Sequence, residues 1–234
     1  MTHYSRHDLI WLSGAGRDYA LRNIQNCIPL VNDKEIRALM LCDPPIPAIV
    51  RRQEPSEDAL LCIGFSSFLI IDGVRLRIAC KAPLDCIARH KTPFDIAKCE
   101  KSHASELIMP GIKILEELAD VGKRCHVQVG CFCSAALQMA TELPYLHKNS
   151  DLDLYLRCEG SQQDLEHFFE QLLNREKQSG ISIDAELEFP GKYGVKLKEL
   201  FGPGKTVLGK GLYDVALLDK HSLWGGKQGR FPEP

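Results

Sequence analysis

Two aspartates, Asp151 and Asp153, occupy alternate positions in the segment DLDLYLR, residues 151–157. Alternation of polar residues with leucine is typical of a strand with one buried face, so both carboxylates should lie on the other face. Two carboxylates this close repel, and each raises the pKa of the other. A divalent cation relieves that repulsion, and carboxylate oxygens suit Mg²⁺ in phosphoryl-group chemistry. The pattern indicates a magnesium site, and the alternative is a half-exposed strand whose aspartates are solvated.

A second acidic strand follows in the segment ISIDAELEF, residues 181–189, where Asp184, Glu186 and Glu188 share one face. Only one of them can lie level with the first pair, because alternate strand residues are about 6–7 Å apart. Asp184 is the neighbour if the two strands run parallel, and Glu188 is nearer if they run antiparallel. We expect the parallel arrangement, with Asp184 as the third metal ligand and as the general base.

Phosphate ligands are expected beside these carboxylates. Ser134 begins a predicted helix over 134–141, and a helix N-terminus offers backbone N–H groups to an anion. His147 lies in the loop before the aspartates, where it either contacts substrate or fixes the turn through a hydrogen bond. The basic residues that could complete a phosphate site are Arg51, Arg52, Lys192 and Arg157.

The elements that must position these residues lie in the second half of the chain. Hydrophobic spacing predicts helices over 112–121, over 134–141 and from Ser161 onward, and strands over 126–132, 151–157 and 181–189. This order predicts a small mixed sheet with helices packed on it. The first half reads as short strands, with a hairpin turn at Asp72-Gly73.

The segment Met109-Pro110-Gly111 breaks the pattern, and we place a domain boundary there. The expected organisation is a β-rich N-terminal domain over 1–108, a catalytic domain over 109–224 and a disordered tail over 225–234. The fold class is therefore α+β.

Composition narrows the function classes. The chain has 29 Lys+Arg against 31 Asp+Glu and a formal net charge of -2, which argues against nucleic-acid binding. No apolar run approaches the ~18 residues of a membrane span, and the N-terminus does not resemble a signal peptide. The 10 cysteines form no CxxC pair, so we interpret them as small buried residues of a cytoplasmic protein, with a structural zinc site as the alternative.

The segments Leu143-Pro144-Tyr145-Leu146-His147 and Ser150-Asp151-Leu152-Asp153-Leu154 resemble the malonate decarboxylase holo-acyl-carrier-protein synthase family, within the nucleotidyltransferase superfamily. HDLIWL, residues 7–12, and PAIVRR, residues 47–52, are similar to the opening of that family. One residue departs from the family pattern: Cys133 stands where the family has a glycine before the serine. Tyr145 is expected to serve packing.

The resemblance implies a nucleotidyltransferase-like sheet and a specific reaction. The phosphoribosyl-dephospho-CoA group of 2'-(5''-triphosphoribosyl)-3'-dephospho-CoA would move to a serine of the apo acyl-carrier protein of malonate decarboxylase, and pyrophosphate would leave. Asp151, Asp153 and Asp184 would bind Mg²⁺. Substrate contacts would come from Ser134, Arg51, Arg52, His147 and Lys192.

Two alternatives stay open on the sequence. Another nucleotidyltransferase, moving AMP from ATP to a small molecule or protein, would use the same Asp151 and Asp153. A non-catalytic nucleotide-binding paralogue is the other, and Cys133 is the residue that favours it.

Overall fold

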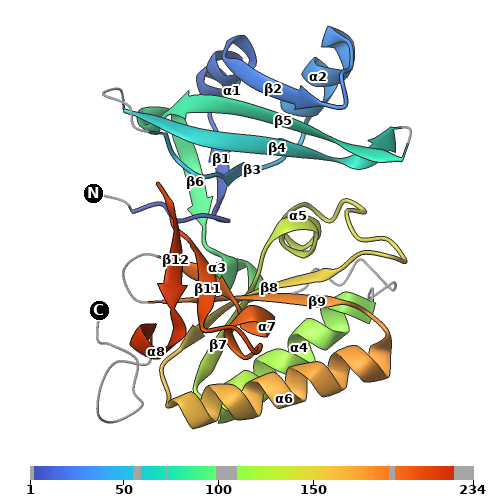
Figure 1. Cartoon of the computed structure of the whole chain (residues 1–234). Helices are drawn as coiled ribbons and strands as arrows, with labels where there is room; N and C mark the ends of the chain where they lie inside the picture. The colour runs from blue at the N-terminus through green and yellow to red at the C-terminus, as the bar shows by residue number, and fades with distance from the viewer. Residues whose placement is uncertain (1–2, 55–58, 72, 99–109, 190–192, 224–234) are drawn as a thin grey trace.

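The computed structural model describes residues 3–54, 59–71, 73–98, 110–189 and 193–223. This part of the chain forms two six-stranded sheets, with the N-terminal sheet stacked above the C-terminal one in Figure 1. The predicted α+β class is confirmed. The predicted boundary at 108/109 and the predicted tail over 225–234 fall at or within segments outside the described residues.

The N-terminal sheet has the order β2-β5-β4-β3-β1-β6, and its neighbouring strands pair antiparallel. Its long hairpin turns at Gly73, whose φ of 77° suits the predicted turn. The strands are β1 (Leu9–Leu12), β2 (Ile24–Ile28), β3 (Ala48–Val50), β4 (Leu60–Ile71), β5 (Val74–Pro83) and β6 (Ile87–Lys91).

The first half also contains helices that the sequence analysis did not predict. They are α1 (Gly14–Arg22), α2 (Asp33–Met40), the 3-10 turn η1 (Leu84–Cys86) and α3 (Pro93–Ala97). Local capping explains α2, because the Asn32 side chain accepts from the Glu35 backbone and the Glu35 side chain accepts from the Asn32 backbone.

The C-terminal sheet has the order β12-β11-β10-β9-β8-β7. It is mixed, as predicted, because β8 and β9 run parallel while the other pairs run antiparallel. The strands are β7 (Val127–Cys131), β8 (Leu152–Cys158), β9 (Ile183–Glu188), β10 (Gly194–Lys196), β11 (Thr206–Lys210) and β12 (Val215–Asp219). The helices are α4 (Pro110–Arg124), α5 (Cys133–Thr141), α6 (Gln162–Ser179), α7 (Leu197–Leu200) and α8 (Lys220–Leu223).

Helix α6 provides the crossover that makes β8 and β9 parallel. It begins at a capping box formed by Ser161 and Asp164 and ends at Gly180, which has a φ of 70°. Its buried stripe includes Leu165, Phe168 and Leu172. Helices α4 and α6 lie side by side under the second sheet, and α5 lies on the side that faces the N-terminal sheet (Figure 1).

Tyr145 joins the two sheets. Its side chain is fully buried, and its hydroxyl donates to the Ser66 carbonyl at 2.9 Å. Arg75 in turn donates to the Tyr145 carbonyl at 2.7 Å. The predicted packing role of Tyr145 is confirmed.

The cysteines of the described part are all free, and Cys62, Cys80, Cys125, Cys131 and Cys158 are buried. Within the same residues, no helix is both long and apolar enough to cross a bilayer.

Candidate active site

Asp153 and Asp184 lie opposite each other on neighbouring strands. Each is the second residue of its strand, and the parallel register of β8 and β9 pairs the two residues directly. The parallel direction expected from the sequence is confirmed. The pair therefore stands at the N-terminal ends of both strands, where α5 also begins.

Asp151 occupies a different environment from Asp153. It precedes β8 and is exposed, whereas Asp153 is half-buried. Burial, followed by the charges of Asp184 and Asp151, raises the pKa of Asp153 to about 7. The strand pattern also led us to expect both aspartates to be exposed, and Asp153 departs from this because Cys133 of α5 lies against its carboxylate.

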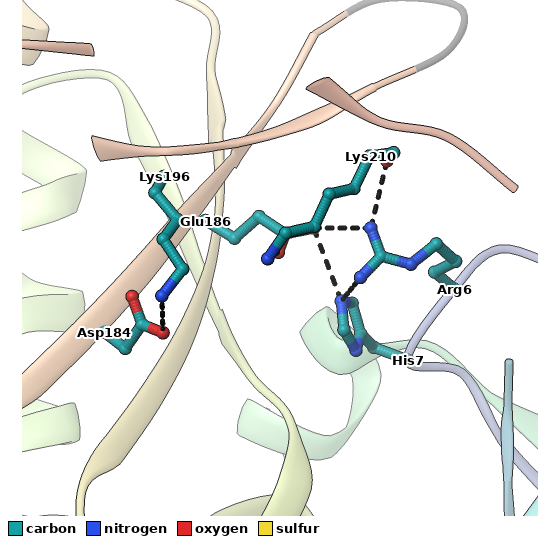
Figure 2. Close-up of polar contacts among 6 residues, drawn as sticks. All are labelled: Arg6, His7, Asp184, Glu186, Lys196 and Lys210. Atoms are coloured by element: carbon teal, nitrogen blue, oxygen red, sulfur yellow. Dashed lines mark hydrogen bonds and ion pairs between the residues drawn. The ribbon is translucent and has the colours of Figure 1, made fainter. Parts of the chain in front are cut away.

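Lys196 of β10 partly compensates this negative charge. Its ammonium donates to Asp184 Oδ2 at 2.8 Å (Figure 2). The hydrogen bond with Asp184 raises the pKa of Lys196. Sequence reasoning missed this residue, because nothing in the chain indicates that β10 folds back antiparallel beside β9.

Cys133 is the first residue of α5 and has a φ of 51°, in the left-handed region that glycine adopts easily. This conformation explains why the family it resembles places a glycine here. The Cys133 thiol hydrogen-bonds to the Asp153 carboxylate, and burial together with that charge raises the pKa of Cys133 to about 12. Cys133 is a protonated thiol, so it is unsuited to act as a nucleophile.

A cleft of about 380 Å³ separates the start of α5 from the N-terminal sheet. Ser134 lines it from α5, as the predicted phosphate contact requires. The side chain of the N-cap residue Phe132 makes no hydrogen bond to the first turn of α5. The opposite wall carries Arg51, Arg75 and Arg77.

Arg52 and Arg157, two of the other predicted basic residues, do not line this cleft. Arg52 is exposed and absent from its lining, and Lys192 lies outside the described residues. Arg157 is paired with Glu188 at 2.7 Å and stacks on Phe94, and it does not line this cleft, so its phosphate contact stays a prediction.

Arg75 and Arg77 were not identified as candidates from the sequence. The signal available was their alternation in VRLRIA, which places both on one face of β5.

His147 is exposed, and its Nδ1 accepts from the Asn149 backbone at 3.3 Å. It lines a second hollow, of about 420 Å³, together with Asp151. These contacts agree with the turn-fixing alternative, and substrate contact by His147 stays a prediction.

Glu186 is not on a solvent face, contrary to what its strand pattern suggested. Its residue is 4% exposed, and its carboxylate pairs with Arg6 at 3.0 Å and Lys210 at 3.7 Å (Figure 2). His7 Nε2 lies 3.4 Å from Glu186 and 3.2 Å from Arg6, so its tautomer selects between donating to the first and accepting from the second.

Burial opposes ionisation of both His7 and Glu186. Burial lowers the pKa of His7, which makes the neutral ring the dominant form at pH 7. Burial alone would raise the pKa of Glu186, but the hydrogen bond from His7 and the charges of Arg6 and Lys210 hold it below its ordinary value. The positive charges that stabilise the Glu186 carboxylate belong to Arg6 and Lys210, because the His7 ring is neutral.

The carboxylates fit a divalent cation as a pair. Asp153 and Asp184 offer hard oxygen ligands, and their mutual repulsion is what a cation would relieve. Among the described residues, no three His, Cys, Asp or Glu side chains converge to hold a metal ion on their own. Magnesium sites in phosphate chemistry commonly use one or two carboxylates, with the remaining ligands from substrate phosphates and water.

Two family models cover most of the chain. Residues 5–93 match the N-terminal domain of phosphoribosyl-dephospho-CoA transferase MdcG, and residues 99–221 match its C-terminal domain. No solved structure gives a significant match.

Curated relatives agree with the family models. A phosphoribosyl-dephospho-CoA transferase of Xanthomonas axonopodis pv. citri is 30% identical over 181 residues, which cover 76% of this chain and 81% of the relative. The enzyme of the same name in Pseudomonas fluorescens is 29% identical over 178 residues, 74% of this chain and 78% of the relative. The chain belongs to the phosphoribosyl-dephospho-CoA transferase family.

Proposed function

We propose that this transferase moves the phosphoribosyl-dephospho-CoA group from 2'-(5''-triphosphoribosyl)-3'-dephospho-CoA to a serine of an apo acyl-carrier protein, the carrier subunit of malonate decarboxylase. The serine oxygen forms a bond to the α-phosphorus, the bond from that phosphorus to the leaving oxygen breaks, and pyrophosphate departs. The register of Asp153 beside Asp184, next to an uncapped helix start, is the observation that carries this proposal.

The donor phosphates bind at the start of α5. The Ser134 hydroxyl and the backbone N–H groups of the first helical turn have the chemistry to hold phosphate oxygens. Asp184 accepts the proton of the carrier serine, and this role requires it to lie within about 3 Å of that hydroxyl in the complex. Lys196 offsets the charge of Asp184 in the free protein.

Asp153 and Asp184 are the proposed ligands of Mg²⁺, with the exposed Asp151 nearby. Magnesium would supply charge neutralisation to the triphosphate. The partial burial of Asp153 excludes much of the bulk water, which strengthens electrostatic interactions at this point.

Transfer of AMP from ATP is the second candidate, because it would use the same carboxylates. The family match over both halves of the chain favours the carrier-protein reaction. A non-catalytic paralogue is disfavoured by the retained Asp153–Asp184 pair, because burial and the charge of Asp184 raise the pKa of Asp153 despite the opposing charge of Lys196.

Intact-mass measurement of the carrier protein tests the proposal. The purified apo carrier is incubated with the chain and Mg²⁺, and with either the triphosphoribosyl donor or ATP. We expect the carrier to gain the mass of phosphoribosyl-dephospho-CoA with the donor and to stay unchanged with ATP. A gain of AMP mass would favour the second candidate, and no gain with either nucleotide would favour the non-catalytic paralogue.

A further inference from the structure

The N-terminal sheet presents three arginines to the cleft above α5. Arg75 and Arg77 extend from one face of β5, and Arg51 follows β3. The guanidinium groups of Arg51 and Arg77 have no hydrogen-bond or ion-pair partner within the described residues. Three cations facing one cleft without a paired carboxylate repel one another, so an anion bound between them is stabilised.

Arg75 is held in place before any ligand binds. Its guanidinium donates to the Ser67 carbonyl at 2.9 Å and to the Tyr145 carbonyl at 2.7 Å. Burial lowers the pKa of Arg75, and the nearby charge of Arg77 acts in the same direction. Positive charge therefore remains uncompensated at this wall.

Gly64 gives Arg51 its path into the cleft. A Cβ at position 64 would lie 3.0 Å from Arg51 Cδ, so a larger residue would displace the Arg51 stem. The absence of a side chain at Gly64 allows the arginine to lie across β4.

The rest of the lining is mixed. Ile49 and Leu137 add apolar surface, whereas the Phe65 and Ile78 side chains are buried in the core on the other face of the sheet. The volume of about 380 Å³ is within the range of small-molecule sites.

We propose that Arg51, Arg75 and Arg77 bind linked phosphates of the donor, so that the N-terminal sheet forms half of the donor site. The inference rests on the proposed function, whose donor carries linked phosphates in two places, as the triphosphate and as the diphosphate of dephospho-CoA. Both present the same chemistry to arginine, which binds phosphate oxygens through paired N–H groups.

Calorimetric titration of the full chain distinguishes these two sources. Inorganic triphosphate and dephospho-CoA are titrated separately into wild type, Arg77→Ala, Arg51→Ala and Arg22→Ala. Arg77 and Arg51 are chosen because their guanidinium groups make no hydrogen bond or ion pair within the described residues, and the exposed Arg22 of α1 is the matched control outside the cleft. We expect Arg77→Ala to weaken binding of at least one ligand about 10-fold or more, with Arg77→Lys retaining part of the affinity.

Weakening in the triphosphate arm assigns the cleft to the leaving phosphates, and weakening in the dephospho-CoA arm assigns it to the nucleotide diphosphate. Unchanged affinity in both arms, no binding by wild type, or equal weakening by Arg22→Ala would overturn the inference. Carrier modification by wild type is measured in parallel, so normal transfer with unaffected arginine variants refutes this site alone, whereas absent transfer refutes the proposed function.

Discussion

Two carboxylates on the same face of β9, Asp184 and Glu186, lie in opposite electrostatic environments. Glu186 is buried among Arg6, Lys210 and the neutral His7, and its pKa is lowered. Asp184 has Lys196 as its partner but also faces Asp153, whose pKa is raised to about 7. The first group is a completed ion network that joins the N-terminal segment to the second sheet, whereas the second carries excess negative charge.

The difference distinguishes a structural ion network at Glu186 from a carboxylate pair that is suited to binding a cation. A buried carboxylate whose charge is fully paired stabilises one arrangement of the chain and has little left to offer a ligand. A carboxylate pair with excess charge is less stable in the free protein and gains from a cation. Burial differs in the same sense, because Glu186 is 4% exposed whereas Asp153 is half-buried.

The largest expected effect is on turnover at the carboxylate pair. Asp153→Asn should lower carrier modification about 10³-fold or more, because a proposed metal ligand is lost while the side-chain volume is kept. Modification is measured by intact mass of the carrier under initial-rate conditions. Asp120→Asn, at an exposed position on α4, is the control and should keep full activity. Near-normal turnover in Asp153→Asn would refute the assignment of Asp153.

Glu186→Gln should mainly lower stability and should affect turnover much less. Removing this charge leaves the half-buried cations Arg6 and Lys210 without their partner, so the free energy of unfolding should fall by about 3 kcal/mol. Urea denaturation measures the change. Turnover per folded molecule should stay within about 10-fold of wild type, well above that of Asp153→Asn. Full stability in Glu186→Gln would show that the network is not the stabilising group.

The comparison also predicts a pH dependence in metal-free buffer. The Asp153 carboxyl ionises near pH 4 when unfolded but near pH 7 in the folded chain, so the native state retains a proton that the unfolded state has lost. This contribution to stability is therefore present at pH 4 and is lost as the pH rises to 7. Asp153→Asn should lack this loss and gain on the order of 2 kcal/mol over wild type at pH 8, as measured by urea denaturation. An equal pH profile in both proteins would contradict the raised pKa.

The smallest effect is expected at Cys133. Cys133→Gly relieves a left-handed residue but loses the thiol hydrogen bond and adds chain entropy to the unfolded state, so stability should change by less than about 1 kcal/mol. Activity should be retained or raised, because the Asp153 carboxylate no longer accepts a hydrogen bond from the thiol. Steady-state kcat/KM measures this, and a large loss would show that the cysteine itself is used.

The sequence predicted the elements of the second half well, because strong periodicity and local caps define them. The alternation in 151–157 and 181–189 and the intervening helix were sufficient to place Asp153 beside Asp184 once a parallel crossover was assumed. The confirmed hairpin at Gly73 likewise follows from local turn chemistry.

The remaining features depend on contacts between distant segments. Glu186 has the pattern of a solvent-facing residue, and only Arg6, 180 positions away in the chain, makes it buried and paired. Arg77 lies on an exposed strand face until the hairpin is placed over α5, and Lys196 depends on the antiparallel return of β10. The short helix α1 carries a weak periodic signal in a segment dominated by strand-like runs, whereas α2 has a capping box and an amphipathic pattern that could have predicted it.

Binding of Mn²⁺ as a spectroscopic substitute for Mg²⁺ tests the central claim most directly. Electron paramagnetic resonance of free Mn²⁺ is recorded while wild type, Asp153→Asn and Glu186→Gln are titrated in the presence of the triphosphoribosyl donor, against a donor-only control. The account predicts that wild type and Glu186→Gln remove Mn²⁺ from solution beyond the donor-only level, and that Asp153→Asn does not. Equal binding by Asp153→Asn and wild type would contradict the claim that the pair on β8 and β9 holds the catalytic metal.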